Sequence, residues 1–255
     1  MITSLLLLIT GGVVAHSDCF DATPSERTAL RVLFIGNSYT HVNKLPEILE
    51  QFSAAARFER QIRCTMATVG GATLERHWNN PDFRELLNSR KWDIVVLQEQ
   101  SLRPIEKPEA FWEYARLWGK KIKANGAKPF FYMTWARKAT PKKQATYTEN
   151  YRKAARGCGG TVVPVGEAWK VVREKRPEIE LFTADGSHPS PAGSYLAACV
   201  FYAVITGRSP VGLPDSYTVS GGDKPKEKKF SREDARYLQR AARDAAKREK
   251  VRSGD

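Results

Sequence analysis

The feature that most constrains the fold is a regular alternation of short, β-rich apolar runs with longer amphipathic stretches, which begins at Arg31. This pattern predicts a parallel sheet covered by helices. The expected strands are residues 31–35, 61–67, 93–97, 129–134 and 161–165. Helical length and apolar spacing are found in residues 45–57, 108–125 and 142–156, and a helix with Ser190 as its N-cap is expected to run to Gly207.

The chain of 255 residues is long enough to bury one sizeable core and to carry additional segments. Residues 27–210 hold the alternating pattern and are expected to form the single catalytic domain. Residues 211–230 contain many Pro, Gly, Ser and Lys residues, which is typical of a surface connection. Residues 231–250 return to helical spacing with a thin apolar stripe, so this last helix is expected to pack on the domain.

A short apolar run near the amino terminus ends in Ala15, His16 and Ser17, a small-x-small cleavage pattern. We therefore expect residues 1–17 to be a signal peptide and the protein to be secreted or periplasmic, although a buried first strand would also explain the run. No other stretch approaches the roughly 20 apolar residues of a membrane span. The sequence predicts no membrane-spanning helix.

The chain is strongly basic, with a formal net charge of +13 and a pI near 9.6. Its basic residues are spread along the sequence without a recognition motif, so no nucleic-acid partner is predicted. In an exported protein the same charge is compatible with weak binding to an acidic polymer or an anionic surface. It is equally compatible with a role in solubility alone.

The four cysteines show no metal-ligand spacing, and no metal is predicted. An exported protein can pair two of them, but the sequence does not choose the pair. Cys199 lies in an apolar helical run and is expected to be a buried thiol.

A serine and a histidine stand where a catalytic pair would be expected. Ser38 follows the first strand directly, and open parallel sheets bind ligands beyond the carboxyl ends of their strands. His188 precedes the capped helix, and Asp185 stands three residues earlier, close enough to orient the imidazole. A serine hydroxyl needs such a base to become nucleophilic, so these three residues predict a catalytic triad. An ordinary turn serine and a capping aspartate are the alternatives.

Stabilising the oxyanion of a tetrahedral intermediate requires hydrogen-bond donors. Gly70 and Gly71 follow the second strand, where their backbone can approach a ligand closely. Gln98 and Gln100 follow the third strand and bring amide side chains to the same sheet edge. Taken singly, both segments are also typical of structural loops.

The four blocks FIGNSYT, VGGATL, VVLQEQS and DGSHPSPAG, in this order at the ends of successive segments, resemble the SGNH/GDSL hydrolase superfamily. The resemblance covers roughly residues 31–207. It implies a flavodoxin-like, three-layer α/β/α sandwich that hydrolyses esters through an acyl-serine, with no metal and no cofactor. It also implies that Ser38, Asp185 and His188 form the triad, and that the amides of Ser38 and Gly71 stabilise the oxyanion.

Two of the four blocks depart from the family pattern. Asn37 stands where GDSL members have an aspartate, and Gln98 and Gln100 stand where the family has an asparagine in a G-x-N-D block. Carbohydrate-acetylesterase relatives place a glutamine directly after the third strand. Gln98 is therefore the first choice for the side-chain oxyanion donor and Gln100 the second.

Aromatic residues follow several of the predicted strands. Trp135 and Trp169 come after the fourth and fifth strands and are predicted to line a sugar-sized or acyl pocket, with core packing as the alternative. The same two interpretations apply to His77 and Trp78 after the glycine block.

The leading functional prediction is a secreted serine hydrolase that cleaves carboxylic esters of small molecules or carbohydrates, with O-acetyl groups on sugars as the expected substrates. An O-acyltransferase would use the same acyl-serine but pass the acyl group to a sugar hydroxyl. A non-catalytic protein that binds acidic polysaccharides on a hydrolase fold is the alternative from another class.

Overall fold

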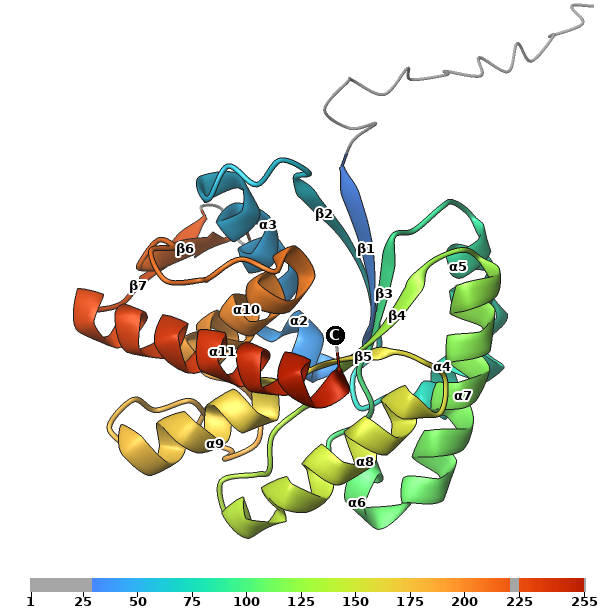
Figure 1. Cartoon of the computed structure of the whole chain (residues 1–255). Coiled ribbons are helices and arrows are strands. Elements are labelled where there is room, and N and C mark those ends of the chain that lie inside the picture. The colour runs from blue at the N-terminus through green and yellow to red at the C-terminus, as the bar shows by residue number, and fades with distance from the viewer. Residues whose placement is uncertain (1–28, 221–224, 255) are drawn as a thin grey trace, which may run out of the picture.

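The computed structural model describes residues 29–220 and 225–254, so the predicted signal peptide lies outside the described part of the chain (Figure 1). Its centre is a five-stranded sheet in the order β2-β1-β3-β4-β5, and all neighbouring strands are parallel. This is the flavodoxin-like strand order. The predicted α/β class and all five predicted strands are confirmed, with bounds β1 Leu30–Gly36, β2 Ile62–Thr68, β3 Ile94–Leu97, β4 Lys128–Tyr132 and β5 Thr161–Val163.

Helices cover both faces of the sheet and complete three layers (Figure 1). Successive side chains of β1 point to opposite faces, so Val32 and Phe34 join one core while Leu33 and Ile35 join the other. The first core is closed by α3 Leu45–Ala55, α9 Val165–Lys175, α10 Pro191–Thr206 and α11 Arg232–Ser253. The second is closed by α4 Leu74–Asn79, α5 Pro81–Asn88, α7 Pro108–Ala124 and α8 Gln144–Arg156. The short helices are α2 Ser38–His41, η1 Val42–Lys44, α6 Arg103–Glu106 and η2 Pro141–Lys143.

Helix α10 begins and ends where its local sequence predicts. The Ser190 hydroxyl accepts a hydrogen bond from the Gly193 amide at 3.1 Å, and Pro191 occupies the first helical turn. Gly207 ends the helix in the left-handed region, with φ of 69°. The start of α10 fixes where the preceding loop, residues 183–189, must end.

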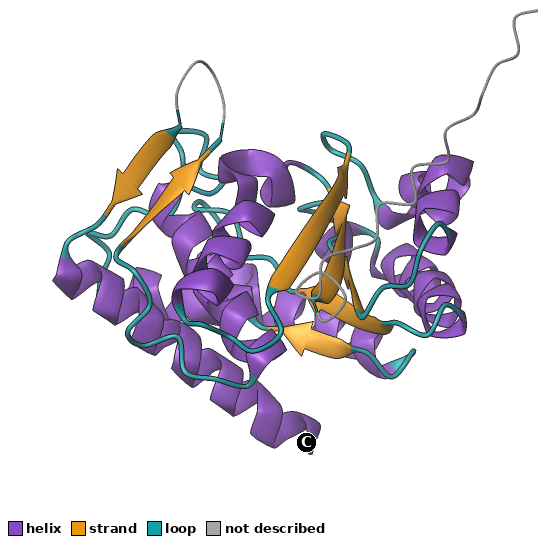
Figure 2. Ribbon diagram, turned by 90° about the horizontal axis from the view of Figure 1, so that it is seen from above, coloured by secondary structure: helices purple, strands orange, loops and turns teal. Residues whose placement is uncertain are grey.

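Residues 211–220 and 225–230 contain more regular structure than the predicted surface connection. Strands β6 Ser216–Val219 and β7 Lys226–Lys229 form an antiparallel hairpin that lies apart from the main sheet (Figure 2). Tyr217 is buried, and its ring lies near those of Tyr195 and Phe230. The hairpin therefore depends on tertiary packing of Tyr217.

Helix α11 runs across α9 and α10 (Figure 1). Leu238, Ala242 and Ala245 are buried in the core that these helices share. Gln239 donates hydrogen bonds to the Tyr195 hydroxyl at 2.7 Å and to a loop carbonyl at 2.8 Å. These contacts make α11 part of the domain core.

The sequence predictions on membrane-spanning helices and on cysteines can be compared with the described residues. Over the described ranges, no helix is both long and apolar enough to cross a membrane. Cys64, Cys158 and Cys199 carry free thiols, and Cys199 is fully buried.

Candidate active site

The turn after β1 places Ser38 at the edge of the sheet. A Cβ atom on Gly36 would lie 2.6 Å from the Gln98 Oε1 atom, so the turn accepts only glycine there. The Asn37 side chain then caps α2 by accepting a hydrogen bond from the Tyr39 amide at 3.1 Å. Ser38 is consequently the first residue of α2 and remains partly exposed.

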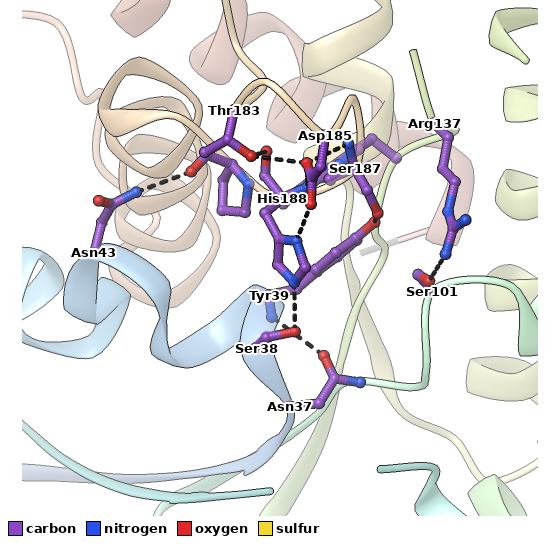
Figure 3. Close-up of polar contacts among 12 residues, drawn as sticks. Asn37, Ser38, Tyr39, Asn43, Ser101, Arg137, Thr183, Asp185, Ser187 and His188 are labelled. Carbon is purple, nitrogen blue, oxygen red and sulfur yellow. Dashed lines mark hydrogen bonds and ion pairs between the residues drawn. The ribbon is translucent and has the colours of Figure 1, made fainter. Parts of the chain in front are cut away.

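The structure brings Ser38, His188 and Asp185 into one hydrogen-bonded row (Figure 3). His188 Nε2 lies 2.8 Å from Ser38 Oγ, and His188 Nδ1 lies 2.5 Å from Asp185 Oδ2. With the Nδ1 proton donated to the carboxylate, Nε2 is free to accept the serine proton. This is the geometry of a nucleophile, a base and a group that orients the base.

Asp185 is held as an ionised carboxylate. The hydrogen bond from His188 holds its pKa well below the usual range, and the Ser187 amide, the Thr183 hydroxyl and the His188 amide act in the same direction. Its Oδ1 atom accepts from both amides at 2.9 Å and from the hydroxyl at 2.7 Å. The carboxylate is therefore fixed in position before any substrate binds.

The loop that carries Asp185 and His188 is anchored from two sides. Asn43 Nδ2 donates to the Pro189 carbonyl and to the Ser194 hydroxyl, both at 3.0 Å. On the other side, Trp135 Nε1 donates to the Ser187 carbonyl at 3.0 Å. These contacts hold the imidazole at a fixed distance from Ser38.

The glycine loop after β2 is hydrogen-bonded to the turn after β1 that carries Ser38, called the nucleophile turn below. Asn37 Nδ2 donates to the Ala72 carbonyl at 3.0 Å, which fixes the residue next to Gly71. Gly71 is exposed and has φ of 65°, a conformation that favours glycine. The structure thus brings Gly71 to the same sheet edge as Ser38.

Comparison with solved structures identifies the family. A protein assigned as an SGNH hydrolase from Slackia heliotrinireducens is 30% identical, with a TM-score of 0.59, and the match covers 69% of this chain and 99% of that one. The chain belongs to the SGNH hydrolase superfamily. No protein-family model and no curated protein sequence matches it.

Two further structures share the fold at lower identity. A DUF4886 family protein from Bacteroides uniformis is 20% identical, with a TM-score of 0.67, and the match covers 85% of this chain and 94% of that one. An acetyl xylan esterase from Geobacillus stearothermophilus is 16% identical, with a TM-score of 0.57, over 68% and 93% of the two chains. At these identities the similarity establishes the SGNH fold alone.

Gln98 does not lie where an SGNH oxyanion donor is expected. Its side chain is fully buried, and Nε2 donates to Asn37 Oδ1 at 2.9 Å and to the Glu99 carbonyl at 2.6 Å. Its Oε1 atom accepts from the Asn37 amide at 2.9 Å and from the Thr40 hydroxyl at 3.0 Å. The structure corrects the prediction for this residue, because one N–H group of Nε2 is bonded to Asn37 in the turn that carries Ser38 and the other to the Glu99 carbonyl.

The same contacts account for the two departures from the SGNH pattern. An aspartate at position 37 has no N–H group to donate to the Ala72 carbonyl, whereas Asn37 both donates there and accepts from Gln98. Gln100 caps α6, since its Oε1 atom accepts from the Leu102 amide at 2.8 Å and the Arg103 amide at 3.0 Å. Gln100 Nε2 donates to the Ser101 hydroxyl at 3.3 Å, so the side-chain amides of both glutamines are hydrogen-bonded within the protein.

Trp135 and Trp169 belong to the core of this SGNH domain. Both are fully buried, with ring centroids 3.6 Å apart and planes at 1°. Trp135 also stacks on Tyr39 at 4.8 Å. The prediction that the two tryptophans line a substrate pocket is therefore corrected. Trp135 supports the triad loop, residues 183–189, through its hydrogen bond to the Ser187 carbonyl, and Trp169 packs on Trp135 and Phe182.

His77 supports the end of β1. It is buried, and its Nε2 atom lies 2.8 Å from the Gly36 carbonyl oxygen. Burial lowers its pKa to about 4, so the neutral ring donates this hydrogen bond near neutral pH. His77 is a positioning residue for the turn that carries Ser38.

Sequence reasoning did not single out Glu99, which follows β3. Its carboxyl group is buried and accepts hydrogen bonds from the Gln100 amide at 2.7 Å and the Leu74 amide at 3.1 Å. Burial raises its pKa to about 7. An acidic residue at the end of an apolar strand was the signal that could have identified it.

The described residues contain no group of three or more His, Cys, Asp or Glu residues placed to hold a metal ion. A hollow of about 380 Å³ lies between α8, α9 and α11, with Arg152 and Lys170 among its lining residues. Its lining includes no member of the Ser38, Asp185 and His188 row.

Proposed function

We propose that this SGNH protein is a serine hydrolase that cleaves carboxylic esters, with Ser38 as nucleophile, His188 as general base and Asp185 as the residue that orients the imidazole. The observation that carries the proposal is the 2.8 Å contact between His188 Nε2 and Ser38 Oγ, continued by the contact to Asp185. A serine hydroxyl attacks an ester only when a base accepts its proton, and this row supplies that base.

The reaction proceeds in two halves. His188 accepts the Ser38 proton as Oγ attacks the ester carbonyl carbon, and the tetrahedral intermediate expels the alkoxide, which takes the proton from His188. Water then attacks the acyl-serine with His188 again as base, and the acid is released as Ser38 regains its proton. Asp185 stays ionised throughout and stabilises the imidazolium.

The backbone amides of Ser38 and Gly71 are the proposed oxyanion donors. Ser38 is the first residue of α2, where amide N–H groups have no acceptor within the helix. Gly71 has no side chain to obstruct an approaching oxygen, and its loop is fixed by Asn37. This assignment leaves Gln98 to hold the turn.

O-acetyl groups on carbohydrates are the proposed substrates, and we propose that the protein is exported, as its amino-terminal sequence predicts, and acts on extracellular polymers. The support is that acetyl xylan esterases are among the solved proteins that share this fold. Because one fold hosts many specificities, substrate assays are needed.

The test is a panel of acetyl, butyryl and longer aryl esters, assayed alongside acetylated sugars. We expect Ser38→Ala and His188→Ala to lower turnover by about 10⁴ or more while the proteins stay folded. Ser89→Ala, at an exposed serine whose hydroxyl donates only to a local carbonyl, is the matched control. After treatment of the wild-type protein with an organophosphonate ester, mass spectrometry should find one adduct, on Ser38. Retained activity in Ser38→Ala would contradict the proposal.

A further inference from the structure

A second polar cluster lies beside the triad loop (Figure 3). The Tyr39 hydroxyl lies 2.6 Å from the Ser187 hydroxyl, and Arg137 Nη2 donates to the Ser101 hydroxyl at 3.0 Å. Burial raises the pKa of Tyr39, whereas hydrogen bonding to Ser187, Ser101 and Arg137 opposes the rise. The two pairs therefore form one cluster around the Tyr39 hydroxyl.

The Arg137 guanidinium is partly buried and lacks the carboxylate partner that Arg103 and Arg152 have. Arg103 pairs with Glu75 and Arg152 pairs with Glu249. Across residues 29–220 and 225–254, no carboxylate lies within ion-pair distance of Arg137, and its buried Nε atom has no hydrogen-bond partner. Partial burial of a cation without a counter-charge is unfavourable, so an anion supplied from outside would complete this site.

The position of Arg137 connects the cluster to the chemistry. Arg137 follows β4, and the next residue, Lys138, donates its amide to the Gly186 carbonyl at 2.8 Å, within the triad loop. In Figure 3, Arg137 and Asn43 lie on opposite sides of this loop, with His188 between them. The guanidinium thus lies at the same sheet edge as the candidate nucleophile.

We propose that Arg137, together with Ser101, forms a subsite that binds a carboxylate of the substrate, so that the preferred esters carry a negative charge. The inference rests on the proposed esterase function and specifies its substrate class. A planar guanidinium presents paired donors that match a carboxylate, which an ammonium group does not. The net charge of +13 adds long-range attraction for such substrates.

The carboxylate can belong to either side of the ester bond, and two substrate pairs distinguish these sources. Acetylated D-glucuronate against acetylated D-glucose tests a charge on the alcohol side. The 4-nitrophenyl half-ester of adipic acid against 4-nitrophenyl hexanoate tests a charge on the acyl side at equal chain length. For each pair the measured quantity is the ratio of kcat/KM for the charged ester to that for the neutral ester.

We expect the wild-type protein to prefer the charged ester in at least one pair. Arg137→Gln should lower that ratio by about 10- to 100-fold, the range of one hydrogen-bonded charge, and Arg137→Lys should restore part of it. Arg116→Gln removes the same charge from an exposed position on α7 and should leave the ratio unchanged. Equal losses on both esters in Arg137→Gln, or no wild-type preference in either pair, would overturn the subsite.

A binding measurement separates this inference from the proposed function. Melting temperatures are measured with D-glucuronate, D-glucose, adipate and hexanoate for wild type, Arg137→Gln and Arg116→Gln. If no ester is cleaved but an anion raises the melting temperature only while Arg137 is present, the esterase proposal fails and the subsite stands. If esters are cleaved but neither anion stabilises the wild-type protein more than its neutral or chain-matched counterpart, the subsite is wrong.

Discussion

The two halves of the candidate triad are held in different ways. The nucleophile turn rests on buried polar side chains: Asn37, Thr40, His77 and Gln98 are each at most 2% exposed. The loop that carries the base is open, with side-chain exposure of 47% for Asp185 and 35% for His188.

This difference separates stability from chemistry within one site. In the turn, every buried polar group depends on its neighbours, so removing one side chain leaves partners unsatisfied. In the open loop, water replaces a lost partner at little cost. Changes in the loop should therefore alter the rate without affecting stability, and changes in the turn should lower both.

The largest expected effect is on the rate, from Asp185→Asn. The asparagine Oδ1 atom can still accept from Thr183 and the loop amides, but its Nδ2 group faces His188 Nδ1 and favours the tautomer with a proton on Nε2. That tautomer cannot accept the Ser38 proton, so kcat should fall by about 10⁴. Steady-state kinetics and thermal melts test this, and a large loss of melting temperature would contradict the proposed separation.

The next effect is expected from Gln98→Ala in the buried turn. The substitution leaves the Asn37 amide and the Thr40 hydroxyl without their acceptor and should cost about 2–4 kcal/mol of unfolding free energy. Gln100→Ala, in the neighbouring loop, should cost less. Denaturant unfolding measures both variants, and an unchanged stability with kcat lowered by about 10² to 10³ would return Gln98 to the role of oxyanion donor.

The contrast also shows what the sequence can predict. Apolar runs and cap residues act locally, which is why the five strands and the start of α10 at Pro191 were predicted correctly. The hairpin was missed because its strands are short and Lys226–Lys229 is polar throughout. Its formation depends on Tyr217 packing against residues distant in the sequence, and no local pattern records that contact.

Site prediction has a similar limit. Position at the end of a strand correctly placed Ser38 at the sheet edge, but it does not specify which way a side chain points. Gln98 and Trp135 also follow strands, yet both turn inward and support the site from below. Arg137 could not be singled out, because the absence of a carboxylate partner is a property of the folded chain.

A smaller effect is expected from Asn43→Ala, which removes the clamp on the triad loop. Loss of its contacts to Pro189 and Ser194, together with a φ of 55° that disfavours alanine, should cost about 1–2 kcal/mol. Turnover should fall by roughly tenfold as His188 loses its fixed position. Asn43→Gly tolerates the backbone conformation but also lacks these two hydrogen bonds. Equally lowered turnover in both variants would show that the hydrogen bonds position His188, whereas wild-type turnover in Asn43→Gly would exclude that role.

The smallest effect is a change in pH dependence within the buried turn, because Glu99 and His77 act in opposite directions. Burial raises the pKa of Glu99 from 4.5 to about 7, so the folded state binds more protons and stability falls as pH rises through this window. Burial lowers the pKa of His77 from 6.5 to about 4, so the unfolded state binds more protons and stability rises with pH.

Between about pH 4.5 and 6.5 the two contributions oppose each other, each with a slope of at most about 1.4 kcal/mol per pH unit. Glu99→Gln retains an acceptor for the Leu74 and Gln100 amides and removes the titration. Its free energy of unfolding, measured relative to that of wild type, should therefore increase as pH rises toward 7. His77→Asn should make the slope of unfolding free energy against pH more negative, because it removes the contribution that rises with pH. Urea unfolding of wild type and both variants at several pH values measures these differences. A stability difference for Glu99→Gln that does not vary with pH would show that the Glu99 carboxyl keeps an ordinary pKa in the folded protein.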